Sequence, residues 1–265
     1  MSERGVQSLR ADHEAVLDVA RSLSADEWAA PSGCAGWRVQ DVLAHLACTF
    51  RTVAEPGTLP PGVTGDLEAT QEVGVAERKD WPPDRVLAEY EELGTRAIEA
   101  LAGLQAPGIG ENMIPIENAG MYPLHMVANA LAFDHYCHLR NDILQPGGPV
   151  DRPSPPHDDL RLEATLEWLI AGLPQMPGPA IAEAVEAPVV LDLTGPGGGT
   201  WTIRPGGDGV EVTDGRADDA VATIRSSAQD FVVWSTLRRP WRDLGVETEG
   251  DTAAAERVLD AIHLF

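Results

Sequence analysis

The sequence predicts a two-domain protein in which an α-helical bundle precedes an α+β domain. Long segments with a helical repeat of apolar residues fill the first half of the chain. Proline and glycine are then concentrated in residues 145–156, which is typical of a linker. Beyond that stretch, short β-rich runs alternate with glycine-rich turns. We therefore expect a helical domain over residues 1–147 and an α+β domain over residues 158–265, with the break near 146–158.

Four long helices are expected in the first half, an arrangement typical of an antiparallel bundle. Ser24–Glu27 is a capping-box sequence and predicts a short additional helix. The Pro31–Gly36 segment interrupts the helical pattern, and Glu55–Gly65 is expected to form a loop. The four long helices are an opening segment from Val6 to Leu23, one that starts at Trp37, one from Pro82 to about Leu104, and one from Tyr122 to Leu144.

The second half is expected to combine helices with short strands. Gly197–Gly199 is interpreted as a hairpin turn, because no phosphate-loop Lys-Ser/Thr pair follows it. The expected strands are Pro188–Leu193, Thr200–Ile203, Val210–Val212 and Ala220–Ile224. The expected helices are Leu160–Leu173, Ile181–Val185, one capped by Ser226–Gln229, and Thr252–Ile262.

Composition limits the partners and the compartment. A formal net charge of −23 argues against binding to nucleic acid or to an anionic membrane surface. No stretch is typical of a signal peptide or of a membrane-spanning helix. The three cysteines, at wide spacings, favour reduced thiols over a disulfide framework. We expect a cytoplasmic protein with a small-molecule substrate, no nucleic-acid partner and no membrane partner. The oligomeric state is left open.

Three residues are candidate metal ligands. Asp134 and His138 are four positions apart, so they are separated by about 40° around a helix, whereas His135 points roughly 100° away from Asp134. His45 lies on an otherwise apolar helix. Two imidazoles and a carboxylate are costly to bury unpaired, and a divalent metal would satisfy all three. In the alternative interpretation, Asp134 is a surface carboxylate that pairs with Arg140 or with a neighbour, and His138 is a satisfied core histidine.

Two longer motifs connect these residues to a known family. Ser24–Trp28, followed by Cys34–Leu46, resembles the N-terminal signature of the mycothiol-dependent maleylpyruvate isomerase family, a group of DinB-like metal-binding four-helix bundles. The resemblance implies a metal bound by His45, Asp134 and His138. The family's isomerase has Glu where this chain has Asp134, a carboxylate one methylene shorter.

The second half resembles the sterol-carrier-protein-like domain that is fused to many members of this family. The segments that carry this resemblance are Gly197–Trp201, Ser226–Phe231, Arg238–Trp241 and Gly250–Asp251. Together with the N-terminal motif, they extend the likeness over nearly the whole chain.

Other reactive side chains give weaker signals. Cys34 precedes a helix start, where a thiol pKa can be lowered, but a thiol-dependent enzyme of this family takes its nucleophilic sulfur from the cofactor. Arg238 and Arg239 form a basic cluster that would suit a carboxylate, or they are solvated residues near a helix end.

The resemblance implies a metal-dependent enzyme that uses mycothiol, for isomerisation or S-transfer on a small electrophilic substrate. Zn²⁺ is the expected ion, because it would hold the cofactor sulfur as a thiolate. Two histidines with one carboxylate also suit non-haem iron. A further alternative is a non-catalytic protein that binds a small apolar ligand, with a vestigial or structural metal site.

Overall fold

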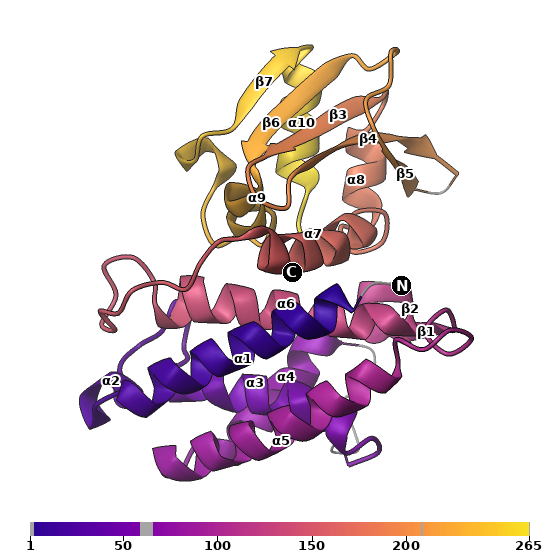
Figure 1. The fold of residues 1–265 in the computed structure, drawn as a ribbon. Coiled ribbons are helices and arrows are strands. Elements are labelled where there is room, and N and C mark those ends of the chain that lie inside the picture. The colour runs from indigo at the N-terminus through magenta and orange to yellow at the C-terminus, as the bar shows by residue number, and fades with distance from the viewer. Residues whose placement is uncertain (1–2, 59–65, 208, 265) are drawn as a thin grey trace. The chain divides into compact units, whose positions relative to one another are not determined.

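The computed structural model describes residues 3–58, 66–207 and 209–264. Contacts divide the chain into two units, residues 1–156 and 157–265. The predicted fold class is confirmed, since the first unit is helical and the second contains a sheet (Figure 1). The domain limits 1–147 and 158–265 stay a prediction. Part of the loop expected over residues 55–65 lies outside the described residues.

Four long helices form the framework of the first unit. Helix α3 packs against α5, and α1 packs against α6 and α5. The starts of the helices follow local rules: α5 has Pro83 in its first turn, and the short α2 has a capping box formed by Ser24 and Glu27. The helices are α1 (Arg4–Ser22), α2 (Ala25–Ala29), α3 (Val39–Ala54), α4 (Leu67–Arg78), α5 (Pro83–Gly103) and α6 (Val127–Cys137). Helix α4 was not expected.

The helix expected from Tyr122 to Leu144 is wrong at its start and changes to π-helical geometry near its end. Its first residues belong to a hairpin of β1 (Met113–Ile116) and β2 (Gly120–Pro123). Tyr122 precedes a proline, and the residue before a proline is driven towards extended backbone. At the other end, His138–Ile143 is π-helical, and the backbone N–H of Leu144 donates to the carbonyl of Leu139. A wider turn of this kind is frequent at functional sites.

The second unit is a five-stranded sheet in the order β5-β4-β3-β6-β7, accompanied by four helices. Strands β3 and β6 are parallel, and the other neighbouring strands are antiparallel. The strands are β3 (Val189–Thr194), β4 (Gly199–Gly206), β5 (Gly209–Asp214), β6 (Ala222–Ser227) and β7 (Glu247–Gly250). The helices are α7 (Asp159–Gly172), α8 (Pro179–Ala184), α9 (Ala228–Ser235) and α10 (Thr252–Ala261). The sequence did not predict β7, whose polar residues lack an apolar alternation.

Among the described residues, no helix combines the length and the apolar character needed to cross a membrane.

Candidate metal site

Three side chains from three helical segments meet inside the first unit. His45 extends from the middle of α3, Asp134 from α6, and His138 is the first residue of the π-helical segment. Asp134 Oδ1 lies 3.2 Å from His45 Nε2 and 3.2 Å from His138 Nε2. Both imidazoles are buried, and the side chain of Asp134 is 19% exposed. The structure therefore brings together the three residues that the sequence singled out as candidate ligands.

The start of α3 fixes the direction from which His45 enters the site. The Arg38 backbone N–H and guanidinium both donate to the carboxylate of Asp41 in the first helical turn. The Trp37 ring, just before the helix, packs against the His45 ring with 5.3 Å between centroids. Arg38 and Asp41 thus cap the N-terminus of α3. His45 follows Asp41 by one helical turn and is buried.

The local electrostatics favour an ionised carboxylate between the two rings. Burial alone would raise the pKa of Asp134, but the neighbouring His45 and His138 hold it well below its usual range. Burial alone would lower the pKa of His138, yet hydrogen bonds to Asp134 and Asp142 hold it well above its usual range. The site is therefore built to keep negative charge on Asp134 in the interior of the bundle.

These donors fit a divalent cation in both chemistry and spacing. Two ligand atoms that each lie about 2.1 Å from a tetrahedral ion are about 3.4 Å apart, close to the 3.2 Å separations in the trio. The second carboxylate oxygen of Asp134 is buried and has no hydrogen-bond partner among the described residues. Two imidazole nitrogens and one carboxylate suit zinc or iron, and three protein ligands leave coordination positions open.

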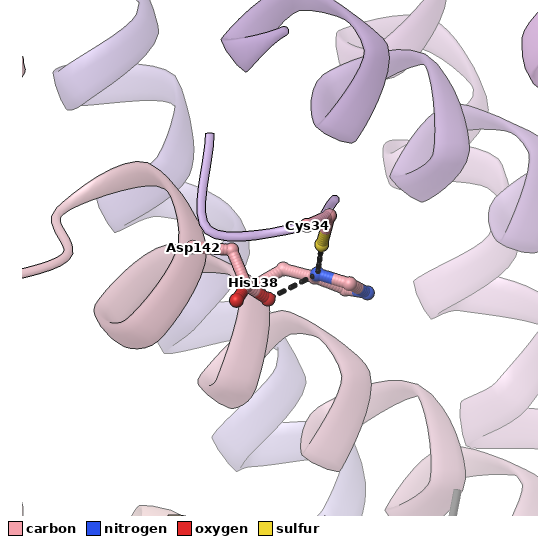
Figure 2. Close-up of side chains that lie close together, drawn as sticks. All are labelled: Cys34, His138 and Asp142. Atoms are coloured by element: carbon pink, nitrogen blue, oxygen red, sulfur yellow. Dashed lines mark hydrogen bonds and ion pairs between the residues drawn. The ribbon is translucent and has the colours of Figure 1, made fainter. Parts of the chain in front are cut away.

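The sequence did not identify Asp142 as part of this site. His138 Nδ1 lies 2.7 Å from Asp142 Oδ2 and 3.6 Å from Cys34 Sγ. Figure 2 shows the side chains of Asp142 and Cys34 beside the His138 ring. The i,i+4 spacing of His138 and Asp142 was visible in the sequence and could have indicated the contact. Cys34 and Asp142 both face the same ring nitrogen. In a nucleophile arrangement the thiol and the carboxylate would face opposite nitrogens, so this cluster does not have that form.

Arg140, considered as a partner of Asp134, and His135, considered as a ligand, both have other partners. Arg140 does not pair with Asp134 but with Asp12, at 2.9 and 3.0 Å. His135 Nδ1 lies 2.8 Å from the Leu131 carbonyl, and burial lowers the pKa of His135 to about 3. Asp134 is therefore not the partner of Arg140, and its near neighbours are His45 and His138.

The basic pair Arg238 and Arg239 lies in the second unit, just after α9. Arg238 is half-buried and donates to the hydroxyl of Thr236, whereas Arg239 is exposed and donates to the carbonyl of Asp243. Both contacts are local to the segment. A role for these arginines in binding a carboxylate stays a prediction.

Comparison with known proteins gives a family and a fold. Residues 9–140 match the family model of the mycothiol maleylpyruvate isomerase N-terminal domain. Two solved structures are similar to the chain: the mycothiol-dependent maleylpyruvate isomerase, at 17% identity, and a histidine-to-alanine mutant described under the same name, at 16%. Each similarity has a TM-score of 0.56 and covers 93% of this chain and 92% of the other. No curated protein matches the sequence. At such identities the structural likeness shows a shared fold.

Proposed function

This chain belongs to the mycothiol-dependent maleylpyruvate isomerase family, and from that premise we propose that it is a metal-dependent enzyme that uses mycothiol. The reaction would be isomerisation of a small electrophilic substrate such as maleylpyruvate, or S-transfer to one. The observation that carries this proposal is the trio of His45, Asp134 and His138, with its buried and unpartnered carboxylate oxygen. A cation in contact with these atoms would satisfy the buried polar groups at once.

Zinc is the ion we propose for this site. When bound, a divalent cation lowers the pKa of a coordinated thiol and so supplies a thiolate nucleophile near neutral pH. His45 and His138 would provide neutral nitrogen donors, and Asp134 would provide the anionic donor. With a single anionic protein ligand, the occupied site would keep a net positive charge, which favours an incoming thiolate.

The aspartate in place of the family's glutamate is compatible with this role. Although its side chain is one methylene shorter, Asp134 Oδ1 lies 3.2 Å from both candidate nitrogens. These distances support coordination by the shorter carboxylate.

The remaining parts of the proposal concern substrate and compartment. Arg238 and Arg239 are our weaker candidates for contact with a substrate carboxylate, since guanidinium groups bind carboxylates through paired hydrogen bonds. We place the reaction in a reducing cytoplasm, a proposal supported by three cysteines that are free thiols in the structure.

Turnover of maleylpyruvate with added mycothiol, measured on zinc-loaded protein, tests the reaction. We expect His45→Ala to abolish turnover and Cys34→Ser to leave it nearly unchanged, because the nucleophilic sulfur belongs to the cofactor. The exposed His263 of the second unit provides the matched control, and His263→Ala should behave as the wild type.

The opposite pattern, in which Cys34→Ser abolishes turnover and His45→Ala does not, would make Cys34 the nucleophile and refute the metal–thiolate mechanism. Elemental analysis of the purified protein tests the metal separately. Iron in place of zinc would favour oxygen chemistry over thiol chemistry.

A further inference from the structure

His138 has a carboxylate at each of its two ring nitrogens, one from the preceding helical turn and one from the following turn. Asp134, at i−4, lies 3.2 Å from Nε2, and Asp142, at i+4, lies 2.7 Å from Nδ1. The two distances have different meanings. A charge-assisted N–H···O hydrogen bond is about 2.7–2.9 Å long, whereas two ligands of one metal ion are about 3.4 Å apart. The Asp142 contact therefore has the length of a charge-assisted hydrogen bond, whereas the longer Asp134 contact is compatible both with a weaker hydrogen bond and with two ligands of one ion.

Asp142 is itself held in place by the loop that precedes α3. The backbone N–H of Gly33 donates to the Asp142 carbonyl at 2.9 Å. A Cβ on Gly33 would lie 2.7 Å from the Asn141 carbonyl oxygen and 2.9 Å from Asp142 Cα, so a larger residue would displace this backbone. The π-helical turn and this close approach together fix the position of the carboxylate.

Cys34, on the same loop, is the second group near His138 Nδ1. Its sulfur lies 3.6 Å away, and a thiol is a weak hydrogen-bond partner compared with a carboxylate. Nδ1 carries at most one proton, and that proton is directed to the closer and charged acceptor. Figure 2 shows both contacts converging on the one nitrogen. Asp142 therefore dominates the environment of Nδ1.

We propose that Asp142 is a positioning residue that holds His138 with its proton on Nδ1 and its Nε2 lone pair directed at the metal site. A partner of this kind also increases the basicity of a ligating imidazole. His45 differs, because its Nδ1 is buried and has no partner among the described residues. His138 is thus the pre-oriented nitrogen donor of the pair. The inference rests on the proposed cation site but not on the proposed reaction.

Zinc affinity provides the first test. Apo-protein is titrated with Zn²⁺ against a competing chelator, and folding is followed by circular dichroism. We expect Asp142→Ala to lower the affinity about 10- to 100-fold and Asp142→Asn to lower it less, with one ion bound per chain. Gly33→Ala should also weaken binding, although residue 33 touches no ligand. Asp18→Asn, which removes an exposed carboxylate on α1, is the matched control and should bind as the wild type.

The second test is made on the wild-type protein, so it does not depend on whether a variant folds. In zinc-loaded protein with ¹⁵N-labelled histidine, long-range nitrogen–proton correlation spectra report which ring nitrogen of His138 carries the proton. We expect the proton on Nδ1. A proton on Nε2, or a second zinc ion that is lost in Cys34→Ala, would make Asp142 a ligand and overturn the positioning role.

The failures are distinguishable. Wild-type protein that binds no zinc would refute the proposed function. Wild-type binding that is unchanged in Asp142→Ala would refute only the positioning role.

Discussion

The two units of this chain bury different kinds of polar group. In the second unit, the buried polar residues of the described part are all serines and threonines: Thr165, Thr202, Thr223, Ser226, Ser235 and Thr236. The first unit also buries ionisable side chains: Asp12, His13, Asp41, His45, Arg78, His135, His138, Arg140 and Asp142. A hydroxyl is satisfied locally by a backbone carbonyl, whereas a buried charge needs a specific partner. The contrast therefore supports the proposal that the chemistry lies in the bundle.

The difference also has an energetic consequence. Replacement of a buried ion pair by well-packed apolar residues is often neutral or stabilising, so such pairs are weak evidence for stability. Stability alone does not account for buried charge in a four-helix bundle, since a fully apolar interior would serve it as well. The proposed metal site gives one reason for it. Arg140 lies in the π-helical segment that also carries His138, and its partner Asp12 lies on α1, so this ion pair joins the π-helical segment to α1.

The largest expected effect comes from the removal of one partner of this pair. Asp12→Ala would leave the buried Arg140 guanidinium without its carboxylate, and we expect the free energy of unfolding to fall by about 3–5 kcal/mol. Urea unfolding measures this. Glu91→Ala, which breaks the half-exposed pair with Arg21 in the same bundle, is the control and should cost less than about 1 kcal/mol. Equal losses for the two variants would show that burial of charge is not what distinguishes the bundle.

The next effect compares one carboxylate from each unit. Asp134→Asn keeps an oxygen in the trio but removes its negative charge, so we expect zinc affinity to fall tenfold or more, equivalent to about 1.4 kcal/mol or more. Asp192, on β3, is also half-buried and lies 3.5 Å from Arg216 and 3.4 Å from Arg225. Asp192→Asn should leave the affinity unchanged. If it weakened zinc binding as much as Asp134→Asn, the site would not be confined to the bundle.

The sequence predicted the regular parts of both units and the phase of the candidate ligands. Helical geometry placed Asp134 and His138 on one face, and β-rich runs with glycine turns predicted four of the strands within a few residues. Sequence patterns did not predict contacts that depend on an irregular turn or on distant backbone. Asp142 takes its place through a π-helical turn and the approach of Gly33, and Asp12 meets Arg140 across 128 positions of sequence. Neither arrangement has a local periodicity.

The pH dependence of the unfolding free energy should reflect the buried histidines of the first unit. Burial lowers the pKa of His13 to about 4 from an ordinary value of 6.5, so the unfolded chain takes up a proton before the folded one does. The stabilising contribution of the neutral residue is therefore complete above pH 6.5 and is lost as the pH falls towards 4. Each proton of difference gives a slope of about 1.4 kcal/mol per pH unit.

We expect His13→Leu to reduce the pH dependence of the unfolding free energy by up to about 1.4 kcal/mol per pH unit. Urea unfolding between pH 6.5 and pH 4.5 measures this change. His13 Nδ1 has no partner among the described residues, so the substitution forfeits no hydrogen bond at that atom. An unchanged slope would mean that His13 is protonated in the folded bundle. His263→Leu, at an exposed position of the second unit, again serves as the control substitution.

The smallest effects are expected in the second unit, where they should have opposite signs at adjacent positions. Ser235 is fully buried, and its hydroxyl has no partner among the described residues, so Ser235→Ala removes an unsatisfied group and should stabilise the protein by up to about 1 kcal/mol. The Thr236 hydroxyl donates to the Val232 carbonyl at 2.7 Å, and Thr236→Val should cost about 1 kcal/mol. Unfolding free energies of the two variants decide the point. A loss of several kcal/mol at either position would mean that hydroxyl burial in the sheet unit is as consequential as charge burial in the bundle, and the distinction between the units would then fail.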